Sequence, residues 1–166
     1  AKAWAALGKM NVIWKSNLSN RIKIEFFRAS VESILLYGSS TWTLTKALTS
    51  RLDGNYTRML RAVKGVSWRM KMKNIDLYDG IAKISETVRQ RRMRFAGHCW
   101  RSKNEIVSDI ILWEPAHGKR SRGRPARTYL DQLKDDTGAE LKELPVLFED
   151  RDAWRELVNS RASSTR

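Results

Sequence analysis

Apolar side chains recur every three or four residues along most of the sequence, and this spacing constrains the fold more than any other feature. The clearest run lies between Asn20 and Tyr37, where one helical face collects Ile24, Phe27, Val31, Ile34 and Leu35. Ser19 stands before this run as an N-cap, and Gly38 follows it as a C-terminal stop. The pattern predicts an all-α protein, an irregular helical bundle.

Further segments are predicted as helices from the same spacing and from their flanking residues. They are Ala1–Lys15, the stretch between Thr45 as N-cap and Gly65, Ile75–Ala82, Glu86–Arg101 after Ser85 as N-cap, Ala126–Thr137 before Gly138, and a last helix that opens at Leu144 and runs through Trp154 and Val158. Asp53-Gly54-Asn55 is typical of a turn, so the second of these segments is either one helix or two. Ile106–Trp113 is short and apolar and fits either a helix or a strand.

The charge of the chain indicates the kind of partner. There are 32 Lys and Arg residues against 18 Asp and Glu, a net charge of +14. A field of that sign and size favours a polyanionic partner: DNA, RNA or an anionic membrane surface. Residues 1–103 hold 21 of the basic and 6 of the acidic residues, so the excess lies before residue 104. No apolar stretch approaches the roughly 18 residues that a membrane span requires.

One predicted helix, Glu86–Arg101, combines an apolar arc with a cationic stripe. The arc consists of Val88, Phe95, Ala96, Cys99 and Trp100. The stripe consists of Arg91, Arg94, His98 and Arg101, at helical spacing on the other side. A solvated helix face usually mixes charges of both signs, whereas no acidic residue occurs here between Glu86 and Glu105. The stripe is therefore either an ordinary solvated face or a surface that contacts phosphates.

A second group of candidate nucleic-acid-binding residues lies in the basic loop before Ala126–Thr137. It comprises Lys119, Arg120, Arg122, Gly123, Arg124 and Arg127. The core Arg122-Gly123-Arg124-Pro125 is similar to an AT-hook, in which Gly lets the backbone approach a narrow minor groove and Arg side chains extend along it. The loop could also contact phosphates only, or simply precede a helix that Pro125 starts. Arg58 and Arg61, on the polar side of an earlier helix, complete the candidates.

No catalytic constellation stands out. Asp135-Asp136 is interpreted as a pair of solvated surface acids, because it lies near a helix end and not on a strand turn that could hold two magnesium ions. His98, Cys99 and His117 have no recognised metal-ligand spacing. Cys99 has no base placed to activate it as a nucleophile. As the only cysteine, it also excludes a disulfide framework. We expect no metal, no cofactor and no enzymatic activity from this chain.

Several motifs follow one another along the sequence. They are Leu35-Leu36-Tyr37-Gly38 with Thr41-Trp42-Thr43-Leu44, then Arg58-Met59-Leu60-Arg61, then Arg91-Arg92-Met93-Arg94-Phe95-Ala96-Gly97-His98, then Leu112-Trp113-Glu114-Pro115 with Arg122-Gly123-Arg124-Pro125, and finally Asp150-Arg151 with Trp154-Arg155 and Val158. In order and spacing they resemble the region after the palm of LINE-type (non-LTR) retrotransposon reverse transcriptases. The resemblance implies a helical polymerase thumb and a C-terminal region that bind nucleic acid. The family's catalytic x-x-D-D box, its endonuclease domain and the zinc knuckle of some relatives have no counterpart in these residues, so the resemblance carries no polymerase activity over to them.

The expected organisation is a thumb-like segment (1–66), a basic helical segment (67–118), the AT-hook-like loop (119–127) and a C-terminal helical segment with a frayed tail (128–166). We expect a module that binds RNA–DNA hybrid, duplex DNA or structured RNA, works beside the polymerase palm of a longer parent chain, and does not bind membranes. It would act in the nucleus after passing through the cytoplasm as a ribonucleoprotein. Two alternatives stay open: a stand-alone chromatin or DNA-binding protein that uses the loop, and a structural RNA-binding subunit of a ribonucleoprotein.

Overall fold

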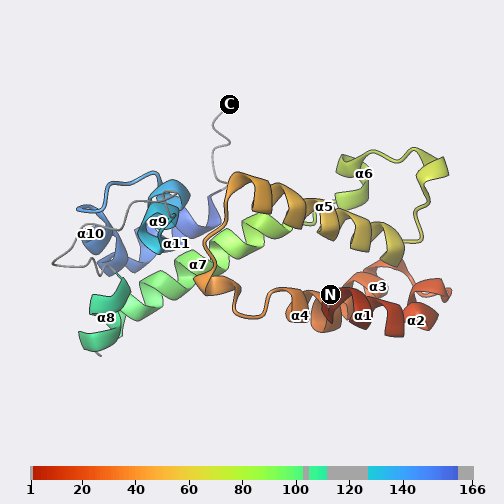
Figure 1. Ribbon diagram of the computed structural model, residues 1–166, viewed down its shortest axis with the longest axis horizontal. Helices are drawn as coiled ribbons and strands as arrows, with labels where there is room; N and C mark the ends of the chain where they lie inside the picture. The colour runs from red at the N-terminus through yellow and green to blue at the C-terminus, as the bar shows by residue number, and fades with distance from the viewer. Residues whose placement is uncertain (1, 103–104, 112–126, 161–166) are drawn as a thin grey trace, which may run out of the picture. The chain divides into compact units, whose positions relative to one another are not determined.

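The computed structural model describes residues 2–102, 105–111 and 127–160, and all regular secondary structure within these ranges is helical (Figure 1). The all-α prediction is therefore confirmed. The helices are α1 (Lys2–Lys9), α2 (Asn11–Lys15), α3 (Asn20–Phe27), the π-helical η1 (Arg28–Glu32), α4 (Ser33–Leu35), the 3₁₀ turn η2 (Ser39–Thr41), α5 (Lys46–Val63), the 3₁₀ turn η3 (Trp68–Met70), α6 (Asn74–Tyr78), α7 (Ile84–Arg101), α8 (Glu105–Ile111), α9 (Tyr129–Thr137), α10 (Leu144–Glu149) and α11 (Arg151–Asn159).

The chain divides into two compact units. The first unit comprises Ala1–Gly38 and Lys46–Ser85, and the second comprises Ser39–Thr45 and Glu86–Arg166. The four sequence segments are drawn from composition and turn residues, whereas the units reflect packing, so the two divisions differ. No helix in the described residues is both long enough and apolar enough to cross a membrane.

The first predicted helix, 1–15, is interrupted in the structure. α1 ends at Lys9 and α2 begins at Asn11. The indole nitrogen of Trp14 donates a hydrogen bond of 2.8 Å to the carbonyl oxygen of Leu7, which holds α2 against the end of α1. Local spacing predicts that both parts are helical, but it does not predict the break at Met10.

In the run from α3 through η1 to α4, the predicted N-cap is confirmed, but the buried face differs from the predicted one. Ser19 accepts a hydrogen bond from the backbone of Ile22, as an N-cap does. The π-helical turn η1 accommodates one more residue per turn than an α-helix, which rotates everything after it. As a result the next buried residue after Val31 is Leu36, while Ile34, predicted on the apolar face, is 42% exposed.

α5 settles the question that Asp53-Gly54-Asn55 leaves open, because it is one continuous helix of 18 residues. The Asp53 carboxylate accepts hydrogen bonds from the backbone and the hydroxyl of Ser85, at 3.0 and 2.8 Å. The prediction of Ser85 as the N-cap of the next helix is wrong, because α7 already begins at Ile84. At its other end α5 stops as predicted at Gly65, whose φ is +67°.

In the second unit, local signals predict where most helices lie and miss two boundaries. Ile106–Trp113 is the ambiguous segment, and its described part forms the helix α8. α9 begins at Tyr129 rather than Ala126, because Thr128 and Asp131 form a reciprocal capping box there. The predicted last helix is two helices, since Asp150 accepts hydrogen bonds from the backbone of Asp152 and Ala153 and starts α11.

The core of the second unit lies beside α7. Figure 1 shows α9, α10 and α11 gathered along the C-terminal half of that helix. The buried side chains are Met93, Ala96 and Cys99 of α7 together with Ile111, Leu133, Leu144, Phe148, Trp154 and Val158. The predicted inward positions Leu130 and Leu133 are both buried, and Gly138 ends α9 with a φ of +72°.

Candidate nucleic-acid interface

α7 positions the candidate site, and its predicted apolar arc is only partly buried. Val88, Ala96 and Cys99 lie in the interior as predicted. Phe95 is 37% exposed, so its assignment to the buried arc is wrong. Two further basic residues of the same helix, Arg89 and Arg92, are not among the predicted site residues, and their side chains are buried.

Arg92 forms a buried ion pair with Asp136. Its Nε lies 2.5 Å from a carboxylate oxygen of Asp136, and the two side chains are 3% and 8% exposed. A second guanidinium nitrogen of Arg92 donates to the carbonyl oxygen of Trp42 at 2.6 Å. Burial raises the pKa of the Asp136 carboxyl, and the hydrogen bond from Arg92 opposes that shift. The interpretation of Asp136 as a solvated surface acid is wrong. Asp135 is exposed and pairs with Arg127.

Arg89 holds the C-terminal ends of two helices. Its guanidinium donates to the carbonyl oxygen of Val158 in α11 at 2.9 Å and to that of Asp136 in α9 at 3.3 Å. Glu86, one turn earlier in α7, balances its charge at 2.8 Å. Because the last carbonyl groups of a helix lack partners within it, a cation placed there satisfies them and interacts favourably with the helix dipole. We call Glu86, Arg89, Arg92 and Asp136 the buried arginine network.

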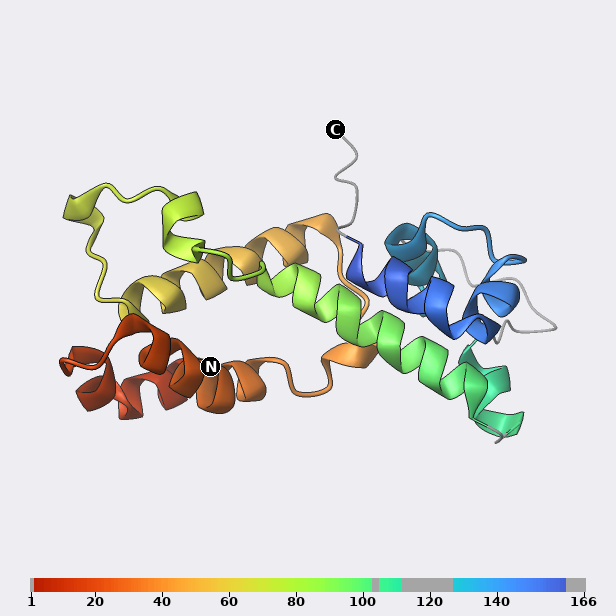
Figure 2. The ribbon, with the colours of Figure 1, turned by 180° about the vertical axis from the view of Figure 1, so that it is seen from behind.

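A close contact between Gly97 and Trp154 brings α7 and α11 together. The indole nitrogen of Trp154 donates to the carbonyl oxygen of Met93 at 3.1 Å. A Cβ atom on Gly97 would lie only 2.5 Å from that nitrogen and 2.9 Å from the adjacent Cδ1. Position 97 therefore needs glycine for its lack of a side chain. Both residues belong to motifs that carry the family resemblance, and Figure 2 shows the two helices side by side from behind.

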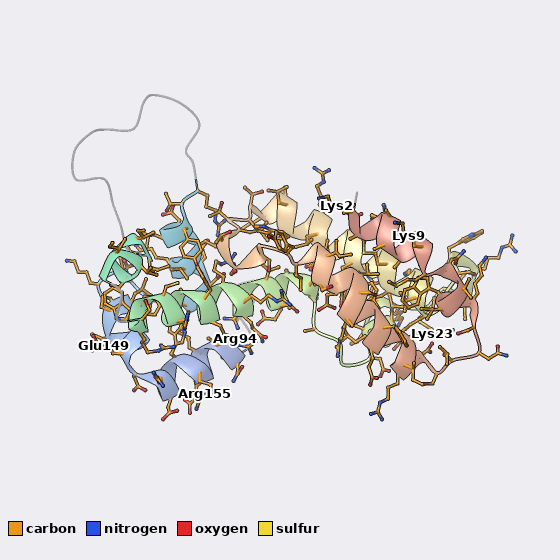
Figure 3. All side chains as sticks on the ribbon, turned by 90° about the horizontal axis from the view of Figure 1, so that it is seen from below. Lys2, Lys9, Lys23, Arg94, Glu149 and Arg155 are labelled. Atoms are coloured by element: carbon orange, nitrogen blue, oxygen red, sulfur yellow. The ribbon has the colours of Figure 1, made fainter. Side chains whose placement is uncertain are left out.

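Next to this contact, α7 and α11 form an open groove of about 680 Å³ with a basic lining. α7 contributes Arg94, His98 and Arg101, and α11 contributes Arg151 and Arg155. The other lining residues are Ser102, Trp154, Val158 and Asn159, so none of the lining residues is acidic. Figure 3 labels Arg94 and Arg155 on the two helices. We call this feature the basic groove.

The lining cations have few carboxylate neighbours. Arg101 donates to the carbonyl oxygen of Phe148 at 2.6 Å, which fixes its side chain without neutralising it. Partial burial, and then the nearby charge of Arg151, lower the pKa of Arg101, as expected where like charges are brought together. Arg155 has an ion pair with Asp152 at 2.8 Å, and both side chains are largely exposed to solvent. The lining of the groove therefore keeps an excess of basic side chains.

The other predicted contact residues that the structure describes do not line the basic groove. Arg91 is exposed on α7 but does not line the groove. Arg58 is exposed on α5, whereas Arg61 donates hydrogen bonds to the carbonyl oxygen of Met72 and the side chain of Asn74. Lys119, Arg120, Arg122, Gly123 and Arg124 lie outside the described residues, as does His117.

The helical spacing predicts the basic residues that α7 contributes to the basic groove, but not those that α11 contributes. Arg94, His98 and Arg101 are predicted from their spacing, and the structure brings them together. Arg151 and Arg155 are not among the candidates, although their i, i+4 spacing on a helix with Trp154 and Val158 facing inward was a signal for one cationic face.

The described residues offer little for other chemistry. No three of their His, Cys, Asp and Glu side chains stand close enough together to hold a metal ion. Cys99 is buried, and burial raises the pKa of its thiol, which disfavours the nucleophilic thiolate.

The chain is similar to an uncharacterized transposon-derived protein of Caenorhabditis elegans, at 24% identity over 177 residues. The match covers 98% of this chain but 63% of the worm protein, so the chain spans less than two thirds of that relative. No family model matches the chain. No solved structure matches it either. The match makes a transposon-related origin plausible.

Proposed function

We propose that this protein is a nucleic-acid-binding module, the thumb and C-terminal part of a non-LTR retrotransposon reverse transcriptase. The observation that carries the proposal is the basic groove, where four arginines and one histidine from two helices line one surface and none of the described lining residues is acidic. Phosphate contacts by Lys and Arg supply most of the affinity of sequence-independent nucleic-acid binding. The sequence resemblance and the transposon-derived relative support the choice of family.

In this proposal the module binds and the chemistry is done elsewhere. The groove would hold the backbone of a template–primer hybrid or of target DNA, and a polymerase palm in a longer parent chain would supply catalysis. The site of action would be the nucleus, reached through the cytoplasm as a ribonucleoprotein. Purified chain should then bind nucleic acid without Mg²⁺-dependent nucleotide incorporation.

Salt-dependent binding tests the groove directly. Fluorescence anisotropy would compare duplex DNA, RNA–DNA hybrid and structured RNA between about 50 and 200 mM salt. The groove variant Arg94→Gln/Arg151→Gln/Arg155→Gln removes three cations from the lining. The matched control Lys2→Gln/Lys9→Gln/Lys142→Gln removes the same charge from exposed positions outside the lining. We expect the groove variant to flatten the slope of log K against log salt by up to about three, and the control to change it much less. Equal losses would show that only net charge matters, and would contradict the proposal.

The alternative of a stand-alone chromatin protein rests on the AT-hook-like residues Arg122-Gly123-Arg124-Pro125. Insertion into a narrow minor groove favours A·T tracts, and Arg suits it better than Lys because its planar head is more weakly hydrated. Competition between AT-rich and GC-rich duplexes would measure that preference. A preference that Arg124→Lys abolishes would favour the alternative. A ratio near one, unchanged by Arg124→Lys, would favour phosphate binding. Preference for structured RNA over both duplexes would favour the ribonucleoprotein subunit.

A further inference from the structure

The turn between α5 and α6 in the first unit presents an exposed tryptophan. Trp68 opens the 3₁₀ turn η3 and is 82% exposed. A tryptophan ring is large and mostly apolar, and in a folded protein it is usually well buried. Its exposure leaves an unfavourable apolar surface in water that an incoming ligand could cover.

Hydrogen bonds to α5 hold this turn in place at both ends. Before the turn, the backbone of Val66 donates to the carbonyl oxygen of Arg61 at 2.8 Å, across the left-handed Gly65. After the turn, the guanidinium of the same Arg61 donates to the carbonyl oxygen of Met72 at 2.8 Å and to the side chain of Asn74 at 3.0 Å. Trp68 is thus presented from a turn with a defined backbone, which lowers the entropy lost when a ligand binds.

The surroundings of the ring are basic. Arg69, Lys71 and Lys73 are exposed on the same turn, and no acidic residue occurs in the sequence between Asp53 and Asp76. The guanidinium carbon of Arg69 lies 5.7 Å from the centre of the Trp68 ring, within the range of a cation–π interaction. An aromatic platform beside cations matches the two parts of a nucleotide, its base and its phosphate.

We propose that Trp68 stacks on an unpaired base of a single-stranded nucleic acid, while Arg69, Lys71 and Lys73 contact the neighbouring phosphates. This second contact rests on the proposed function for its class of ligand, but it lies in the other unit and uses stacking instead of charge alone. Stacking on an aromatic ring tolerates any base, because every base has a π face. The turn therefore binds single strands or frayed ends without reading their sequence.

The shape of the turn favours a base over a lipid surface. Peripheral binding to anionic membranes uses amphipathic helices whose long apolar face enters the headgroup region. η3 spans only three residues, and basic residues alternate with its apolar ones. The exposed apolar residues of η3, Trp68 and Met70, form a much smaller surface than the apolar face of such a helix, whereas the Trp68 ring is large enough to stack on a base.

The test compares Trp68→Ala, Trp68→Phe and the wild-type chain by fluorescence anisotropy, on a labelled single-stranded 12-mer and on a blunt duplex. Tyr37→Ala is the matched control, because Tyr37 is an exposed aromatic residue of the same unit with no basic residue within four positions. We expect Trp68→Ala to weaken single-strand binding by about five- to a hundredfold, Trp68→Phe to retain much of it, and duplex binding to change by less than about twofold. Tyr37→Ala should bind both probes like the wild type.

The salt slope separates stacking from charge. Trp68→Ala should lower single-strand affinity without changing the slope, whereas Lys71→Gln/Lys73→Gln should flatten it by about 1.4. Thermal unfolding should be unchanged in every variant, since the substituted side chains are exposed.

The remaining outcomes overturn the proposal in distinguishable ways. If Trp68→Ala binds single strands normally while the groove variant loses binding, the stacking site is wrong and the basic groove stands. If the wild-type chain binds none of the probes, both proposals fail. If Trp68→Ala loses binding to phosphatidylserine vesicles and keeps single-strand affinity, the turn is a membrane contact instead.

Discussion

The buried arginine network and the basic groove both contain arginine side chains of α7, but these side chains have different roles. Arg89 and Arg92 point into the second unit, and Arg94 and Arg101 line its groove. The two buried arginines meet carboxylates and helix-end carbonyl groups at hydrogen-bond distance. The groove arginines line an open surface together. A run of basic residues is therefore not one functional feature, because the partners of each side chain decide what it does.

The two regions should also respond differently to solvent. Salt screens exposed charges strongly and buried pairs much less. The groove should therefore lose its ligand as salt rises, while the network keeps stabilising the fold.

Removing Arg92 should have the largest effect on stability. Arg92→Ala leaves the Asp136 carboxylate buried without its cation, which should cost about 3–5 kcal/mol of unfolding free energy. The matched control Arg94→Ala removes a groove arginine and should change stability by less than about 0.5 kcal/mol. Urea denaturation measures both, and labelling of the buried Cys99 thiol reports independently on opening of the second unit.

Acid should reduce the cost of Arg92→Ala. Loss of the cation raises the pKa of Asp136 in the folded variant further above its value in the unfolded chain. The lost free energy of unfolding is therefore present only at pH values where the carboxyl is ionised in the unfolded chain. The destabilisation should be small below about pH 4 and should grow as the pH rises. If Arg92→Ala costs no more than Arg94→Ala at pH 7, the network does not stabilise the fold.

A side chain at position 97 should lower both the stability of the fold and the affinity for nucleic acid. Gly97→Ala places a methyl group against the indole of Trp154, which is buried and hydrogen-bonded. We expect the free energy of unfolding to fall by about 1–3 kcal/mol. Nucleic-acid binding should also weaken, because α11 must shift and carries Arg151 and Arg155 with it.

Gly54→Ala is the control for that prediction, because nothing lies within 4 Å of a Cβ at this helical position. It should leave binding unchanged and stabilise the chain by about 0.5–1 kcal/mol. A Gly97→Ala variant that is as stable as the wild type would mean that the helices do not meet so closely.

Exchanging Arg for Lys should separate geometry from charge. Arg92→Lys keeps the charge but cannot reach both Asp136 and Trp42 with a planar fork, and should cost about 1–2 kcal/mol. Arg94→Lys, in the groove, should change nucleic-acid affinity by less than about threefold, because an ammonium also contacts phosphate. If Arg94→Lys abolishes binding, the groove recognises its ligand by geometry and resembles the network more than we propose.

Freeing Arg155 should have the smallest effect. Asp152→Asn removes the exposed carboxylate that pairs with this groove residue. We expect binding to tighten by about two- to threefold at low salt, and stability to change by less than about 0.5 kcal/mol. Glu140→Gln is a control, because it removes an exposed carboxylate that pairs with Lys134 outside the groove lining. Equal tightening in both variants would show that only the net charge matters.

Features that depend on neighbouring residues were predictable from the sequence. Ser19 caps its helix, and Gly65 and Gly138 end theirs in left-handed conformations. The cationic spacing of Arg94, His98 and Arg101 also follows from the period of one helix. These signals involve hydrogen bonds and sterics within a turn or two, so the sequence determines them before any helix packs.

Tertiary structure decided the rest, because it concerns which side chains meet. The adjacent residues Arg91 and Arg92 look alike in the sequence, but Arg91 is exposed, whereas Arg92 is buried against the carboxylate of Asp136, 44 positions away. Arg151 and Arg155 become part of the candidate site because α11 packs against α7, where Trp154 contacts Gly97 and Arg89 donates to the carbonyl oxygen of Val158. The periodicity of a helix shows which residues share a face, but the partner of that face is chosen by packing between residues far apart in the chain.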